Sequence, residues 1–105
     1  MVRRKLGNTE YQVSPVAYGG IVSMSDGQKE SDRYVKWAMD HGINYYDVAP
    51  TYGDAQEKLG NSLRPYRNDV YLACKTEQRG AKGAEEALKE SMRLLHTDYF
   101  DNYQL

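Results

Sequence analysis

Two kinds of segment alternate along the chain: short apolar runs, which predict strands, and longer stretches with apolar residues at helical spacing, which predict helices. The predicted strands are residues 16–18, 43–49, 70–76 and 99–105. The predicted helices are residues 30–41, 55–63 and 84–95. Before the first of these strands, the turn-forming residues Gly7-Asn8-Thr9 separate segments 3–6 and 11–13, which predicts a small hairpin.

The residues around the predicted helices include capping signals. Ser31 or Asp32 is expected to cap the first helix at its start, and Gly42 is expected to end it in a left-handed conformation. We interpret His41 and His96 as helix-end residues rather than as catalytic ones. Residues 80–83 lack the spacing of a phosphate-binding loop and are expected to form a plain loop.

The alternation of strands and helices predicts an α/β fold in which parallel strands are joined by helical crossovers. Such crossovers are right-handed, which limits the possible arrangements. Two arrangements satisfy the pattern, a closed eight-stranded barrel and an open doubly wound sheet. The pattern alone leaves both possible.

Composition narrows the possible partners and compartment. The chain has 105 residues, with 14 Lys and Arg against 15 Asp and Glu, so its net charge of -1 gives no reason to expect a nucleic acid or a membrane as partner. Cys74 is the single cysteine, which excludes an internal disulfide and a cysteine zinc cluster and suits the cytoplasm. No apolar stretch has the length of a signal peptide or a membrane span. The chain has 10 Tyr and 1 Phe, so we expect tyrosines in the core, with partners for their hydroxyls.

Three polar residues fall where parallel strands end. Asp47 and Lys75 lie near the carboxyl ends of the second and third predicted strands, and Tyr52 lies in the loop between them. Active sites of parallel α/β folds are built on this rim. An ammonium group near a tyrosine favours the phenolate, so such a tyrosine can give a proton to a carbonyl oxygen while a hydride reaches the carbon. The spacing alone fits an ordinary structural ion pair between Asp47 and Lys75 equally well.

The segment from His41 to Gly53, His41-Gly42-Ile43-Asn44-Tyr45-Tyr46-Asp47-Val48-Ala49-Pro50-Thr51-Tyr52-Gly53, resembles the aldo-keto reductase signature. Similar matches, in the family's order, are Arg4-Lys5-Leu6-Gly7-Asn8-Thr9, Val13-Ser14-Pro15, Gly19-Gly20, Gln56-Glu57-Lys58-Leu59-Gly60, Val70 to Thr76, Ser91-Met92-Arg93-Leu94-Leu95 and Thr97-Asp98-Tyr99 through Gln104-Leu105. The resemblance implies a partial (β/α)8 TIM barrel, made of the first four strands and three helices after an N-terminal hairpin. Residues 1–105 would then be the incomplete amino-terminal portion of an NADP-dependent oxidoreductase domain.

The same resemblance implies the chemistry of the site. The family usually uses NADPH to reduce aldehydes or ketones to alcohols. By resemblance Tyr52 is the proton donor, Lys75 lowers the pKa of Tyr52, and Asp47 pairs with Lys75 beside the nicotinamide. Gly20 and Ile21 fall where the family's backbone approaches the cofactor.

The chain departs from the family at its end. The family's fourth catalytic residue is a His directly after the residues matched by Gln104-Leu105, and a complete barrel needs about 250 residues. We therefore expect the isolated chain to be inactive, and to self-associate through exposed strand edges and apolar faces. Two alternatives stay open: a non-catalytic barrel fragment, and a cofactor-binding regulatory subunit resembling the family's channel-associated members.

Overall fold

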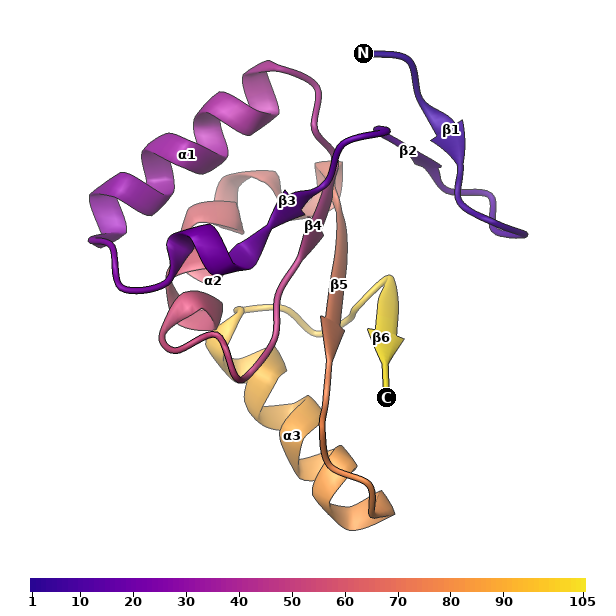
Figure 1. The fold of residues 1–105 in the computed structure, drawn as a ribbon, viewed down its shortest axis with the longest axis vertical. Helices are drawn as coiled ribbons and strands as arrows, with labels where there is room; N and C mark the ends of the chain where they lie inside the picture. The colour runs from indigo at the N-terminus through magenta and orange to yellow at the C-terminus, as the bar shows by residue number, and fades with distance from the viewer.

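The computed structural model describes residues 1–105 as a parallel sheet with all three helices on one of its faces (Figure 1). The sheet order is β3-β4-β5-β6, with every neighbouring pair parallel. Its strands are β3 (Tyr18–Gly19), β4 (Tyr45–Asp47), β5 (Tyr71–Lys75) and β6 (Asn102–Gln104). The helices are α1 (Gln28–Asp40), α2 (Ala55–Leu63) and α3 (Ala81–Leu94), and two 3-10 helices are η1 (Gly20–Ser23) and η2 (Arg64–Asp69). The predicted α/β architecture with an N-terminal hairpin is therefore confirmed.

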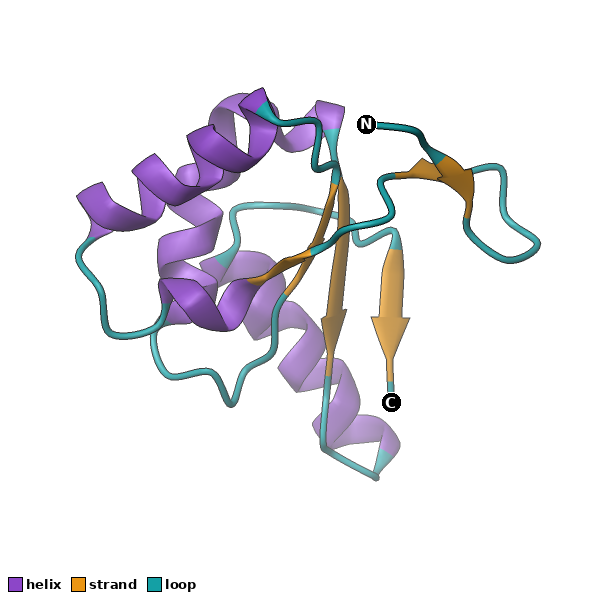
Figure 2. Cartoon of the chain, turned by 45° about the horizontal axis from the view of Figure 1, so that its top comes forward, coloured by secondary structure: helices purple, strands orange, loops and turns teal.

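The hairpin of β1 (Arg4–Lys5) and β2 (Gln12–Val13) is antiparallel and stands apart from the main sheet (Figure 2). Asn44, just before β4, holds it in place, because its side chain accepts a hydrogen bond from Ser14 N at 2.7 Å and donates one to Gln12 O at 2.8 Å. The Tyr11 and Tyr71 rings also stack, with centroids 4.6 Å apart. The hairpin is thus attached at the end of the sheet where the strands begin.

Helix α2 has its predicted bounds, whereas α1 and α3 begin earlier than predicted. The predicted cap at Ser31 or Asp32 is wrong: Gly27 is the N-cap of α1, without a side-chain cap bond, and Ser31 lies buried inside the helix. The prediction of a loop at residues 80–83 is also wrong, because α3 begins at Ala81. A single glycine within a helix, here Gly83, costs only about 1 kcal/mol and does not end it.

The predicted helix ends are confirmed. Gly42 has a φ of +84° and follows His41, the C-cap of α1. His96 follows the C-cap of α3 with a φ of +53°, which is uncommon for a residue other than glycine. Its Nε2 lies 2.9 Å from Asn61 Oδ1, and this contact fixes the ring on the end of α2.

Tyrosines do contribute to the core between the sheet and the helices, as predicted. Tyr46 is fully buried and Tyr18 nearly so. The Tyr46 hydroxyl donates to Ile43 O at 3.1 Å, and the Tyr18 hydroxyl lies 2.9 Å from Ser23 Oγ. Burial raises the pKa of both phenols above its ordinary value. The core also contains Val35, Val48, Leu59, Leu63, Leu72, Cys74 and Leu95.

The face of the sheet without helices is largely polar. Because side chains alternate along a strand, Tyr45, Asp47, Tyr71 and Lys75 share this face. Across the sheet, Asn102 Nδ2 donates to the Tyr45 hydroxyl at 3.2 Å. Large exposed apolar side chains lie elsewhere, among them Val16, Ile21, Val22, Trp37 and Leu105. No helix is both long enough and apolar enough to cross a membrane.

Candidate active site

Asp47 and Lys75 are the last residues of the neighbouring strands β4 and β5. Their side chains project from the same face, and Lys75 Nζ donates to Asp47 Oδ2 at 2.8 Å. The side chains are 30% and 25% exposed, so the pair is partly shielded from water. The predicted meeting of these two residues at the carboxyl rim of the sheet is therefore observed.

Tyr52 is held beside this pair by the turn that leads from β4 into α2. The turn is closed by two backbone hydrogen bonds, from Tyr52 N to Ala49 O at 3.2 Å and from Ala55 N to Tyr52 O at 3.0 Å. Lys75 Nζ lies 5.6 Å from the centroid of the Tyr52 ring. One ammonium group thus contacts a carboxylate and also lies within cation–π range of a phenol ring.

The surroundings of Lys75 raise the pKa of its ammonium group. Burial by itself lowers the pKa of Lys75, but the hydrogen bond from its ammonium to Asp47 and the charge of that carboxylate outweigh burial. Tyr52 acts in the same direction as Asp47, so the pKa of Lys75 lies above its usual value. The other carboxylate oxygen, Asp47 Oδ1, is shielded from solvent and has no hydrogen-bond partner. The site therefore keeps a fixed positive charge and one free acceptor.

Gly20 and Ile21 lie in η1, directly after β3. A Cβ on Gly20 would lie 2.6 Å from Asp47 O and 2.9 Å from Val48 Cβ, so only glycine fits there. Gly20 therefore has a packing role against the backbone of the candidate acidic residue. Ile21 is 49% exposed.

Cys74 does not belong to the site. It is fully buried on the helix side of β5, as strand alternation predicts, and its thiol donates to Gln56 Oε1 at 3.4 Å. Burial raises the pKa of the Cys74 thiol. Both observations indicate a packed thiol rather than a reactive one.

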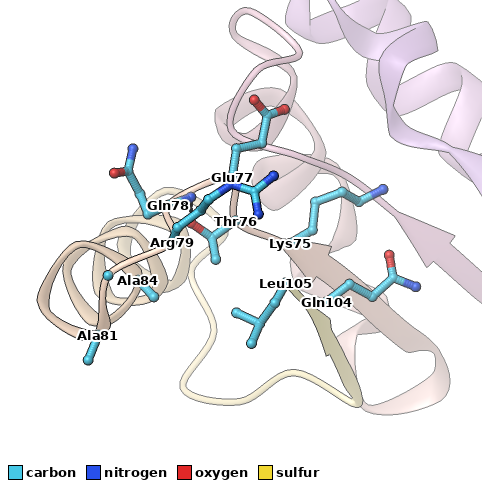
Figure 3. Close-up of a pocket in the computed structure, with 10 residues that line it drawn as sticks. Lys75, Thr76, Glu77, Gln78, Arg79, Ala81, Ala84, Gln104 and Leu105 are labelled. Atoms are coloured by element: carbon cyan, nitrogen blue, oxygen red, sulfur yellow. Dashed lines mark hydrogen bonds between the residues drawn. The ribbon is translucent and has the colours of Figure 1, made fainter.

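A pocket of about 920 Å³ opens beside Lys75, between the loop after β5 and the end of β6 (Figure 3). Its lining residues are Lys75, Thr76, Glu77, Gln78, Arg79, Gly80, Ala81, Ala84, Gln104 and Leu105. Of these, the sequence pattern places only Lys75 in the site. The signal that could have identified Gln78 and Arg79 is their position directly after a parallel strand, on the rim that carries Asp47.

The model of the Aldo/keto reductase family matches residues 20–105. The oxidoreductase YqkF of Bacillus subtilis is 34% identical over 119 aligned residues, which cover 100% of this chain and 39% of YqkF. Aldo-keto reductase AKR11C1 of Bacillus halodurans, in its holo form, superposes with a TM-score of 0.86 and 33% identity, over 100% of this chain and 40% of that one. An aldo-keto reductase of Klebsiella pneumoniae solved in complex with NADPH gives a TM-score of 0.82 at 27% identity, over 98% and 39%.

The protein therefore belongs to the aldo/keto reductase family, and its sheet and helices align with part of that family's TIM barrel. It spans about two fifths of the length of these relatives.

Proposed function

We propose that this chain carries the acid–base part of a carbonyl-reducing site, in which Tyr52 protonates the oxygen of an aldehyde or ketone. The observation that carries the proposal is the position of Lys75 Nζ, 2.8 Å from Asp47 Oδ2 and 5.6 Å from the Tyr52 ring centroid. A structural ion pair between strands needs no phenol beside it. The phenol of Tyr52 beside the ion pair is what favours a catalytic site over a purely structural ion pair.

Each residue has a distinct role in the proposal. Tyr52 gives its hydroxyl proton to the carbonyl oxygen as the carbonyl becomes an alcohol. The Lys75 ammonium stabilises the phenolate that Tyr52 leaves. Asp47 keeps Lys75 charged and aimed, consistent with the raised pKa of that lysine. The substrate is a small carbonyl compound.

The residues at this rim fit a nicotinamide cofactor. Asp47 Oδ1 is a shielded acceptor without a partner, suited to the amide group of a nicotinamide. Gly20 and Ile21 border the same rim, and we assign them to the cofactor side of the site. When bound, NADPH supplies the hydride. The NADPH in the Klebsiella pneumoniae relative supports this choice of cofactor.

This chain of 105 residues spans 39% of YqkF. We therefore expect full activity from a complete barrel as long as those of the relatives, and little turnover from the 105 residues alone. The test uses a chimera that joins this chain to the part of AKR11C1 that follows the matched region. Oxidation of NADPH with 4-nitrobenzaldehyde as substrate measures turnover. We expect Tyr52→Phe to lower kcat by roughly two to four orders of magnitude, as loss of an acid catalyst does.

The matched control is Tyr71→Phe, which removes a hydroxyl from the same sheet face at the far end of β5. It should leave kcat within a factor of about two, as expected of a group outside the chemistry. A chimera that keeps its rate with Tyr52→Phe would show that Tyr52 is not the acid. A chimera that binds NADPH but reduces no carbonyl would instead favour a cofactor-binding regulatory role.

A further inference from the structure

A continuous chain of hydrogen-bonded side chains runs through the interior from β3 to α2. The Tyr18 hydroxyl lies 2.9 Å from Ser23 Oγ, and Ser23 Oγ lies 3.0 Å from Ser31 Oγ. Ser31 Oγ lies 2.8 Å from Ser62 Oγ, which donates to Asp32 Oδ1 at 2.7 Å. Ser23 and Ser31 are completely buried, and Ser62 is 5% exposed. Four hydroxyls and one carboxylate therefore form a single line.

The carboxylate fixes the direction of this line. A carboxylate only accepts hydrogen bonds, and each hydroxyl has one proton to donate. Ser62 donates to Asp32, so Ser62 must accept from Ser31, Ser31 from Ser23, and Ser23 from Tyr18. Ser31 is the central link, because it contacts a serine from η1 on one side and a serine from α2 on the other.

The first of these serines ends the segment that borders the candidate site. Ser23 is the last residue of η1, and Gly20 is the first. Gly20 packs directly on the backbone of Asp47, where an added Cβ would lie 2.6 Å from its carbonyl oxygen. The hydroxyl chain therefore anchors one end of η1, and the Asp47 backbone supports the other.

The residues after η1 contact the loop that carries Tyr52. A Cβ added to Gly53 would lie 2.8 Å from Met24 Cγ, so Met24 packs closely on Gly53. Ser25 N donates to Asp54 Oδ1 at 2.9 Å. Residues 20–25 thus contact both ends of segment 47–54.

We propose that the line from Tyr18 to Asp32 is a positioning device, with Ser31 as its central positioning residue. It holds residues 20–25 against residues 47–54, and through them it sets the place of Tyr52 relative to Asp47 and Lys75. The inference rests on the proposed function only for the use of those three residues. The mechanical coupling stands on the contacts alone.

The test is amide hydrogen exchange of the 105-residue chain, followed by NMR. Ser31→Ala leaves Ser23 without an acceptor and Ser62 without its serine donor. We expect exchange in residues 20–25 and 52–55 to become faster by about tenfold or more, beyond any change in α3. Ser91→Ala is the matched control, because Ser91 is also buried, on α3, and its hydroxyl has no partner. It should leave both segments unchanged relative to the rest of the chain.

Val70 is buried and lies just before β5, at the end opposite Lys75, so Val70→Ala provides a general loss of stability for comparison. Tyr18→Phe is a milder second variant, because it removes only the terminal donor. It should speed exchange in the same two segments by about threefold, within the range for one buried hydrogen bond.

If Ser31→Ala and Tyr18→Phe speed exchange there no more than Val70→Ala does, the hydroxyl chain positions nothing and the inference is wrong. Exchange does not depend on catalysis. Loosened segments together with an active Tyr52→Phe chimera would overturn the proposed function and leave this coupling intact.

Discussion

The Lys75 ammonium lies 2.8 Å from Asp47 Oδ2, between the last residues of two adjacent parallel strands. The two residues are offset by two positions along the sheet, because Asp47 pairs in register with Ala73, and the long Lys75 side chain spans this offset to reach the carboxylate. Both residues leave their strands on the polar face, where the Tyr52 ring also lies. The Asp47–Lys75 pair therefore lies at the centre of the candidate site.

Asp47→Asn should lower the pKa of Lys75. Burial lowers the pKa of this lysine and the Asp47 carboxylate raises it more than Tyr52 does, so removal of the charge takes away the main cause that raises the pKa. Lysine ¹³Cε chemical shifts followed by NMR from about pH 9 to about pH 12 measure the titration. Lys75→Met identifies its signal. Asp40→Asn is the control, because Asp40 raises the pKa of Lys36 and not that of Lys75.

The same shift has a consequence for stability. A lysine whose pKa is raised on folding stabilises the native state fully below its unfolded pKa, about 10.4. That contribution is lost as pH rises through the folded value. An Asp47→Asn variant whose Lys75 titrated as in the wild type would contradict the pairing.

Arg67→Ala should destabilise the chain strongly. The Arg67 and Asp101 side chains are 12% and 14% exposed, and removal of one partner from a buried pair costs about 3–5 kcal/mol. The Arg67 guanidinium also lies 3.9 Å from the centroid of the Tyr99 ring. Its further hydrogen-bond acceptors are Thr97 Oγ1 at 3.0 Å, Val70 O at 3.3 Å and Tyr99 O at 2.8 Å.

Urea unfolding measures this loss. Arg93→Ala is the control, because Arg93 pairs with Glu90 on the exposed surface of α3 and its removal should leave the urea midpoint nearly unchanged. Equal midpoints for the two variants would show that Arg67 does not hold the α3–β6 connection to η2.

Gly60→Ala and Gly83→Ala should have opposite effects, although both glycines lie inside helices. Alanine is favoured over glycine in a helix by about 1 kcal/mol. A Cβ at Gly60 would lie 2.6 Å from both Leu94 O and Leu95 Cα, which are backbone atoms, and such overpacking costs about 1–3 kcal/mol. At Gly83 the nearest atom is 3.1 Å away, in the flexible and exposed side chain of Gln78.

Thermal unfolding distinguishes the two outcomes. We expect a lower Tm for Gly60→Ala and a higher one for Gly83→Ala. A higher Tm for both would mean that α2 does not pack on the α3–β6 turn as closely as the structure shows.

The sequence predicts much of this fold because local signals and long-range packing agree. The bounds predicted for helix 55–63 match those of α2, because apolar spacing defines the helix and Pro65 follows its end. Ser31 shows the opposite case. Its side chain has the chemistry of a cap, but it bonds to Ser23 and Ser62, which lie 8 and 31 residues away in the chain. No local pattern reports partners at such separations.

In the candidate site too, some features follow from the sequence pattern and others depend on long-range packing. The apolar runs show where the strands end, and that is enough to place Asp47 and Lys75 on one rim. The packing of Gly20 on Asp47 does not follow from the apolar pattern, since it depends on how η1 turns after β3. Alternation likewise divides the strand residues between two faces of the sheet, but it does not say which of the two faces the helices cover.

Tyr46→Phe should make the stability of the fold less sensitive to high pH. Burial is the main cause that raises the pKa of Tyr46, so the folded protein keeps this proton at a pH where the unfolded chain loses it. Stability therefore falls as pH rises above about 10, by about 1.4 kcal/mol per pH unit for one such group. Phenylalanine cannot ionise. Near neutral pH the variant should be less stable by about 1 kcal/mol, because it loses the hydrogen bond to Ile43 O. In urea unfolding at about pH 8, the wild type should be more stable than Tyr46→Phe. At about pH 11.5 the order should be reversed, with the wild type less stable than the variant. A constant difference across that range would mean that the Tyr46 phenol is not the group that makes the fold sensitive to alkali.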